Sequence, residues 1–163
     1  MASPQPDISA AKPDWSREQR RHGEWNPGKK LLASIRDYQR HGGLRRKLAV
    51  LRHRFWSMVS GADIPINTQI GGGLLIPHPN GIVIHSAAVI GPNCLIFQQV
   101  TIGDADGIPT IGGHVDIGAG AKVLGAITVG DHARIGANAV VLRDVPEGAT
   151  MVGIPARALN TRV

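Results

Sequence analysis

Residues 111–140 read IGGHVD-IGAGAK-VLGAIT-VGDHAR-IGANAV, consecutive six-residue units that each begin with Ile or Val. The same period runs through earlier parts of the chain, at Ile64, Ile70 and Ile76 and again at Ile84, Ile90, Ile96 and Ile102. Gly follows the aliphatic residue in many of these units. A period of six does not fit an α-helix, which repeats every 3.6 residues, whereas such units build parallel β-helices. The stretch therefore predicts a solenoid of hexapeptide repeats.

A second position in each unit also points inward. Side chains alternate in a strand, so the residue two before each repeat aliphatic shares its face. These residues are mostly small or apolar: Ala88, Cys94, Val100, Val115, Ala121, Ile127, Ala133 and Ala139. Cys94 is the only cysteine, which excludes an internal disulfide and fits a cytoplasmic protein. Its inward position favours core packing over a role as nucleophile.

The repeat is interrupted twice. Eight residues separate Ile76 from Ile84, where the sequence is PHPNG, and nine separate Ile102 from Ile111, where DADG is inserted. A stacked solenoid accommodates extra residues only as loops, which often lie on a binding face. Both interruptions are therefore candidate parts of a site.

The chain divides into four regions. Residues 1–28 lack periodicity and are expected to form a mobile leader. Residues 29–60 form a short helical cap segment, residues 61–147 the β-helix, and residues 148–163 a tail that folds back along it. The second helix of the cap segment carries an apolar stripe, which we expect to cover the open end of the solenoid. The stripe consists of Leu44, Leu48, Leu51, Phe55 and Met58.

Charge is concentrated at the N-terminal side. Residues 1–60 hold 13 Lys and Arg against 5 Asp and Glu, whereas residues 61–163 hold 5 against 7. A basic segment can bind nucleic acid or a membrane surface. Without a nucleic-acid motif or a set of stacking aromatics, a solvated helical face is the preferred interpretation, and no nucleic-acid partner is predicted. No apolar stretch reaches the ~20 residues that span a bilayer.

Longer motifs resemble the serine O-acetyltransferase group of the hexapeptide-repeat acyltransferases. They are Asp63-Ile64-Pro65, residues 73–83 (GLLIPHPNGIV), 118–125 (GAGAKVLG), 135–142 (IGANAVVL) and 152–157 (VGIPAR). The resemblance implies a mainly β fold, a left-handed parallel β-helix with a short N-terminal helical segment. It also implies homotrimers with active sites between subunits, trimers that can pair, and acetyl transfer from acetyl-CoA to a hydroxyl group.

The resemblance assigns roles to individual residues. His78 matches the catalytic histidine, which takes the proton of the acceptor hydroxyl, a task that suits a neutral imidazole. Asp63 lies slightly less than one coil earlier and matches the aspartate that orients the imidazole. Small residues at coil corners would let the pantetheine arm lie against the backbone, and basic side chains would meet its phosphates. These acetyl-CoA-binding residues are Gly103, Ala119, Lys122, Ala137 and Arg157, and no metal is predicted.

Two departures from the group concern the acceptor. Where serine acetyltransferases carry Arg-His-Pro-Lys-Ile, this chain has Gly107-Ile108-Pro109-Thr110-Ile111, and Pro77 replaces the aspartate before the catalytic histidine. The acceptor is therefore either serine, for cysteine biosynthesis, or the hydroxyl of a sugar or polysaccharide.

Two other classes stay open. A metal-dependent lyase of the γ-carbonic anhydrase kind would need several histidines at one metal, for which His78, His85 and His114 are available. A non-catalytic binding module would use the basic helices as its contact surface.

Overall fold

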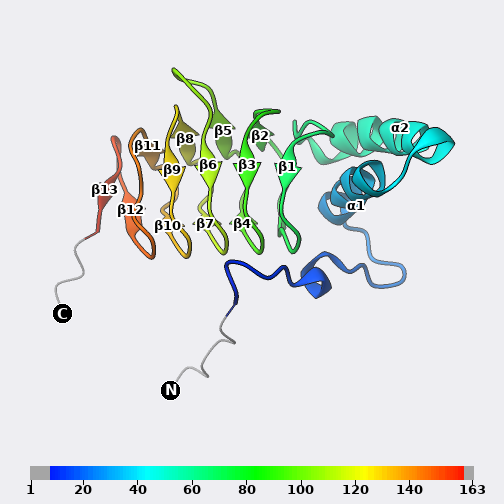
Figure 1. The fold of residues 1–163 in the computed structure, drawn as a ribbon, viewed down its shortest axis with the longest axis horizontal. Helices are drawn as coiled ribbons and strands as arrows, with labels where there is room; N and C mark the ends of the chain where they lie inside the picture. The colour runs from blue at the N-terminus through cyan, green and yellow to red at the C-terminus, as the bar shows by residue number, and fades with distance from the viewer. Residues whose placement is uncertain (1–7, 160–163) are drawn as a thin grey trace.

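The structure, a computed structural model, describes residues 8–159. These residues form a solenoid of stacked strands with two helices at one end (Figure 1). The helical elements are η1 (Trp15–Glu18), α1 (Pro27–Arg40) and α2 (Gly43–Ser60). The strands are β1 (Gln69–Ile70), β2 (Val83–Ile84), β3 (Val89–Ile90), β4 (Leu95–Ile96), β5 (Thr101–Gly103), β6 (Thr110–Ile111), β7 (Asp116–Ile117), β8 (Lys122–Leu124), β9 (Thr128–Val129), β10 (Arg134–Ile135), β11 (Val140–Val141), β12 (Thr150–Val152) and β13 (Arg157–Ala158).

Every third strand joins the same sheet, as a coil of three six-residue sides requires. The orders are β1-β3-β6-β9, β11-β8-β5-β2 and β13-β12-β10-β7-β4, and all pairs are parallel except that of β12 with β13. Lys122 pairs with Val140 of the next coil and with Thr101 of the coil before it. The step from β5 to β8 is longer than the step from β8 to β11 because it contains the insertion that follows β5. The predicted parallel β-helix is confirmed.

The core consists of the residues that the period selects. All the repeat aliphatics from Ile64 to Val141 are buried, and so are the eight residues that precede them by two positions. Cys94 is fully buried, and its thiol lies 3.2 Å from the carbonyl oxygen of Gly112. Burial raises the pKa of this thiol to about 11, which keeps it protonated and unreactive at neutral pH. Its predicted packing role is confirmed.

Helix α1, rather than the stripe on α2, covers the open end of the solenoid. Leu31, Leu32 and Ile35 of α1 are buried in the same cluster as the first coil. The apolar stripe predicted to do this is instead exposed, with Leu44 at 72% and Met58 at 78%. Periodicity identified an apolar face on α2 correctly, but the shorter helix α1 occupies the solenoid end. The prediction of a cap made by α2 is therefore wrong.

The leader follows the solenoid axis within its described part, residues 8–26. The Asn93 side chain donates to the carbonyl oxygens of Ser9 and Lys12 and accepts from the Asp14 amide at 2.7 Å. Nearby, Trp15 lies against Gly72 of the first coil. This arrangement differs from the mobile leader expected for residues 1–28, of which residues 1–7 lie outside the described part. Composition could not indicate it because the contacts join segments far apart in the sequence.

The solenoid also continues past its expected end at residue 147. Strand β12 still pairs in parallel with β10, and only β13 reverses direction, pairing antiparallel with β12. The last residues of the expected tail, 160–163, lie outside the described part. Within residues 8–159, no helix combines the length and apolar character needed to cross a membrane.

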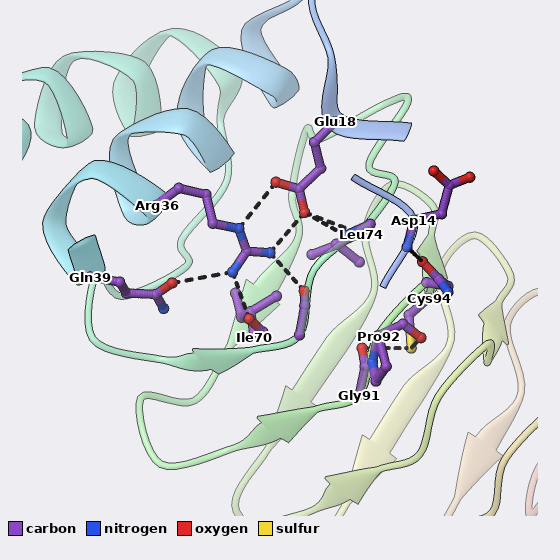
Figure 2. Close-up of polar contacts among 12 residues, drawn as sticks. Asp14, Glu18, Arg36, Gln39, Ile70, Leu74, Gly91, Pro92 and Cys94 are labelled. Atoms are coloured by element: carbon purple, nitrogen blue, oxygen red, sulfur yellow. Dashed lines mark hydrogen bonds and ion pairs between the residues drawn. The ribbon is translucent and has the colours of Figure 1, made fainter. Parts of the chain in front are cut away.

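A buried ion pair completes the open end (Figure 2). The Arg36 guanidinium donates to the carbonyl oxygens of Ile70 and Gly71, at 2.6 Å each, and to both carboxylate oxygens of Glu18. The Glu18 carboxylate in turn accepts from the amides of Gly73 and Leu74, at 2.8 and 3.1 Å. Backbone groups of the first coil that lack a preceding coil are thereby paired. Such groups would be costly to bury unpaired.

Removing Arg36 should therefore destabilise the protein strongly. Arg36→Ala leaves the buried Glu18 carboxylate without its counter-ion and two carbonyls without a donor, which we expect to cost about 3–5 kcal/mol in the free energy of unfolding, measured by urea titration. The control is Arg52→Ala, which breaks the exposed Arg52–Asp37 pair at 2.6 Å and should cost no more than about 1 kcal/mol. Equal losses in the two variants would contradict this account of the cap.

Candidate functional site

Four of the five residues predicted to bind acetyl-CoA lie in one sheet of the solenoid, β2-β5-β8-β11, or in the turns that lead into it, and Arg157 lies in another sheet. Gly103 ends β5 and Lys122 begins β8, while Arg157 in β13 follows Ala156, whose amide bonds to Val140 of β11. Ala119 and Ala137 lie in the turns that lead into β8 and β11. Ala119, Lys122 and Ala137 therefore lie at the edge where the chain enters this sheet, whereas Gly103 lies at its other edge and Arg157 lies outside the sheet.

The turns that enter this sheet stack directly on one another, and hydrogen bonds join each to the next. The backbone amides of Gln99, Gly120 and Asn138 each donate to a backbone carbonyl oxygen of the preceding turn, at 2.8 to 3.0 Å. The accepting carbonyls are those of Asn80, Gln98 and Ala119, in the same order. The first turn in this stack is the loop that contains His78. One continuous corner therefore runs from the candidate base to Ala119 and Ala137.

Small residues in this corner follow from the close approach of the coils. A Cβ atom at Gly118 would lie 2.6 Å from the backbone nitrogen of Ala137, so only glycine fits there. Beside it, Ala119 is partly exposed and Ala137 is exposed. At Ala119 and Ala137 the corner therefore presents backbone with little side chain over it, a surface against which an extended chain can lie.

One of the two predicted cations lies beside this corner, and the other lies at the last coil. The Lys122 ammonium donates to the carbonyl oxygen of Gln99 at 2.7 Å, which holds the charge beside the corner. Arg157 lines a small hollow together with Leu142 and Arg143, near the end of the sheet. Lys122 therefore lies where an anionic group of a chain bound along the corner could reach it.

His78 and Asp63 both lie at the first strand of the same sheet. His78 is exposed in the loop before β2, and Asp63 forms a parallel bridge with Val83 of β2. The Asp63 backbone amide donates to the carbonyl oxygen of Ile82 at 2.8 Å, and the Ile84 amide donates to the backbone carbonyl oxygen of Asp63 at 2.9 Å. Within residues 8–159 no hydrogen bond joins the two side chains. Their pairing as base and orienting group therefore stays a prediction.

His53 of α2 is a neighbour of Asp63 that the sequence did not reveal. Its imidazole lies 3.3 Å from the hydroxyl of Ser34 and is buried. Burial lowers the pKa of His53, while a hydrogen bond with the backbone of Ile64 and the charge of Asp63 oppose this shift. The helices thus contact the segment that holds Asp63. No local signal in the sequence marks this histidine, since it lies in a basic helix.

The remaining histidines lie at other corners. His85 follows β2, and its amide donates to Ile102 beside Gly103. His114 and His132 pair through their Nδ1 atoms at 2.8 Å at the corner between β6 and β7, and burial lowers the pKa of His114. Within residues 8–159, no three His, Cys, Asp or Glu residues are grouped as they would be around a metal ion.

The second insertion leaves the other edge of the same sheet, after β5, and projects from the solenoid (Figure 1). Gly107 has a φ of 133°, and a Cβ atom there would meet Ala126 of the next coil. The position that matches the arginine of serine acetyltransferases is thus one where a side chain is strained. Ile108, at the position that matches the histidine of that motif, is partly buried and packs against the core.

Comparison with known proteins finds serine acetyltransferases among the relatives of the chain, although no family model matches it. It is 50% identical to a serine acetyltransferase of Synechocystis sp. over 106 residues, which are 62% of this chain and 43% of the relative. It is 47% identical to the serine acetyltransferase of Helicobacter pylori over 106 residues, 62% of each. The chain thus spans about half of these relatives' length.

Solved structures of serine acetyltransferases also match the fold of this chain. A serine acetyltransferase in complex with CoA superposes with a TM-score of 0.72 at 39% identity, covering 83% of this chain and 57% of that one. The Neisseria gonorrhoeae serine acetyltransferase in complex with serine gives 0.71 at 37%, covering 82% and 57%.

The stacked sheets and their six-residue period define a hexapeptide-repeat β-helix protein. Within that class, the chain is a homologue of the serine acetyltransferases.

Proposed function

We propose that the protein is an acetyl-CoA-dependent O-acetyltransferase, with L-serine as the first acceptor to test. The observation that carries the proposal is the stacked corner, which joins the His78 loop to the small residues Ala119 and Ala137. The relatives support the same reading, since one is a serine acetyltransferase in complex with CoA and another is in complex with serine.

In the proposed reaction, the corner and the face of β5 and β8 hold the pantetheine arm in an extended form. Gly103, Ala119 and Ala137 leave room for it, and Lys122 and Arg157 meet the phosphates. An extended ligand along this corner would bring its thioester toward the first strand, where His78 lies. Binding both reactants in this way removes most of the entropic cost of their encounter.

His78 is proposed as the general base. Its neutral imidazole accepts the acceptor's hydroxyl proton as the oxygen attacks the thioester carbonyl, and the C–S bond then breaks. The proton passes to the departing sulfur, so acetyl-CoA and an alcohol yield an ester and CoA. Asp63 is proposed to orient the imidazole from the adjacent layer, and His53, packed near Asp63, supports that layer.

The proposal also includes a homotrimer with sites between subunits, as the resemblance implies. The donor is a cytoplasmic metabolite, so we place the protein in that compartment, which suits the free thiol of Cys94.

Replacing His78 should abolish most turnover without preventing acetyl-CoA binding. We expect His78→Ala to lower kcat by ~10²–10⁴, because the hydroxyl loses its base. Release of free CoA measures turnover, and calorimetry measures acetyl-CoA binding. His22→Ala, which changes an exposed histidine of the leader, is the control and should be fully active. Full activity in His78→Ala would refute the mechanism.

The acceptor site should bind serine weakly. Loss of a bidentate arginine–carboxylate contact, for which Gly107 leaves no room, costs about 1.5–3 kcal/mol, or roughly tenfold to a hundredfold in affinity. CoA release should therefore saturate with serine only at high concentration. Pro77→Asp restores a partner for the ammonium group and should raise kcat/KM for serine.

A sugar hydroxyl is the second candidate, favoured by the same lack of charged groups for a zwitterion. A panel of amino acids and sugars in the CoA-release assay separates the two. Tight saturation by serine with all sugars inert, and no gain in Pro77→Asp, would contradict the argument about the acceptor.

A further inference from the structure

Helix α2 carries an exposed apolar stripe that the fold leaves uncovered. Its six residues lie within about 100° of arc at 3.6 residues per turn. They are Leu44 (72% exposed), Leu48 (50%), Leu51 (62%), Phe55 (52%), Met58 (78%) and Val59 (40%). The opposite face of α2 holds the buried residues Ala49, His53 and Ser60, which fixes the stripe toward the outside. Large side chains exposed side by side usually mark an interaction surface.

Basic residues border this stripe on both sides. On helical geometry, Arg45 and Arg52 lie along one edge, and Lys47 and Arg54 lie along the other. With Arg46, helix α2 has five basic residues among 18 and no acidic one. Asp37 of the neighbouring helix pairs with Arg52 and offsets only one of these charges.

We propose that α2 lies on the surface of an anionic lipid bilayer, with the stripe in the headgroup–acyl boundary and the bordering cations on the lipid phosphates. This arrangement of an apolar face and flanking Lys and Arg is that of interfacial helices. Long basic side chains can place their stems along the apolar region and their charges at the headgroups.

The charge distribution distinguishes this partner from two others. A second copy of α2 would cover the stripe but would bring five positive charges against five, with no acid on either helix. A nucleic acid would match the charge but leave six apolar side chains against a polar backbone. An anionic bilayer matches both features at once.

The proposal is tested by cosedimentation of the full chain with vesicles. We expect binding to mixed phosphatidylcholine–phosphatidylglycerol vesicles and much weaker binding to phosphatidylcholine alone. Arg45→Glu with Arg54→Glu should remove this preference, since each basic residue near an anionic surface contributes about fivefold.

Leu48→Gln with Phe55→Gln should lower the partition coefficient at least ~tenfold. Both side chains are half-exposed, so folding should be retained, which the urea midpoint checks. The matched control is Leu142→Gln, equally exposed at 50% but on the solenoid, which should bind like the unaltered protein.

Several results would overturn the proposal. These are equal binding to both vesicle types, no vesicle binding, or an equal loss in Leu142→Gln. A smaller mass of the Leu48→Gln, Phe55→Gln variant in sedimentation velocity would instead assign the stripe to contacts between copies. Binding of duplex DNA that survives this double substitution, without vesicle binding, would assign the basic residues to nucleic acid.

Discussion

The buried pair of Arg36 and Glu18 is the interaction on which the rest of the solenoid depends. A β-helix satisfies its backbone by stacking each coil on the one before, so the first coil has no such partner. Here a guanidinium supplies donors to the carbonyls of Ile70 and Gly71, and a carboxylate supplies an acceptor to two amides. Because Glu18 belongs to the leader and Arg36 to α1, one pair joins both of these segments to the first coil. The side chains of α1 can then close the apolar core.

Beyond the first coil, hydrogen bonds between stacked coils fix the position of each turn relative to the next along the solenoid axis. Each turn into the sheet β2-β5-β8-β11 is hydrogen-bonded to the next, so the placement of the His78 loop and of Ala137 is linked through the backbone. The leader runs along a different corner, at Asn93, and leaves this sheet's edges to the two inserted loops. The repeats that form the hydrophobic core thus also set the relative positions of the residues in the proposed site.

The sequence predicted the solenoid because its period of six identifies inward positions residue by residue, and every repeat aliphatic from Ile64 to Val141 is buried. The same stacking explains why four of the predicted acetyl-CoA-binding residues lie on or beside one sheet, whereas Arg157 belongs to another. Contacts between distant segments carried no such signal. The Asn93–leader contacts and the Arg36–Glu18 pair join segments that are far apart in the sequence. The outward position of the α2 stripe follows from α1 covering the solenoid end, and an amphipathic pattern predicts an apolar face without indicating what covers it.

The central claim is that acetyl-CoA lies along the corner that leads from Ala137 to the His78 loop. A crystal structure of the protein with bound CoA tests it most directly. The account predicts the pantetheine arm against Ala119 and Ala137, with the sulfur toward His78 and the phosphates toward Lys122 or Arg157. CoA bound at another corner, or with its sulfur directed away from His78, would contradict it.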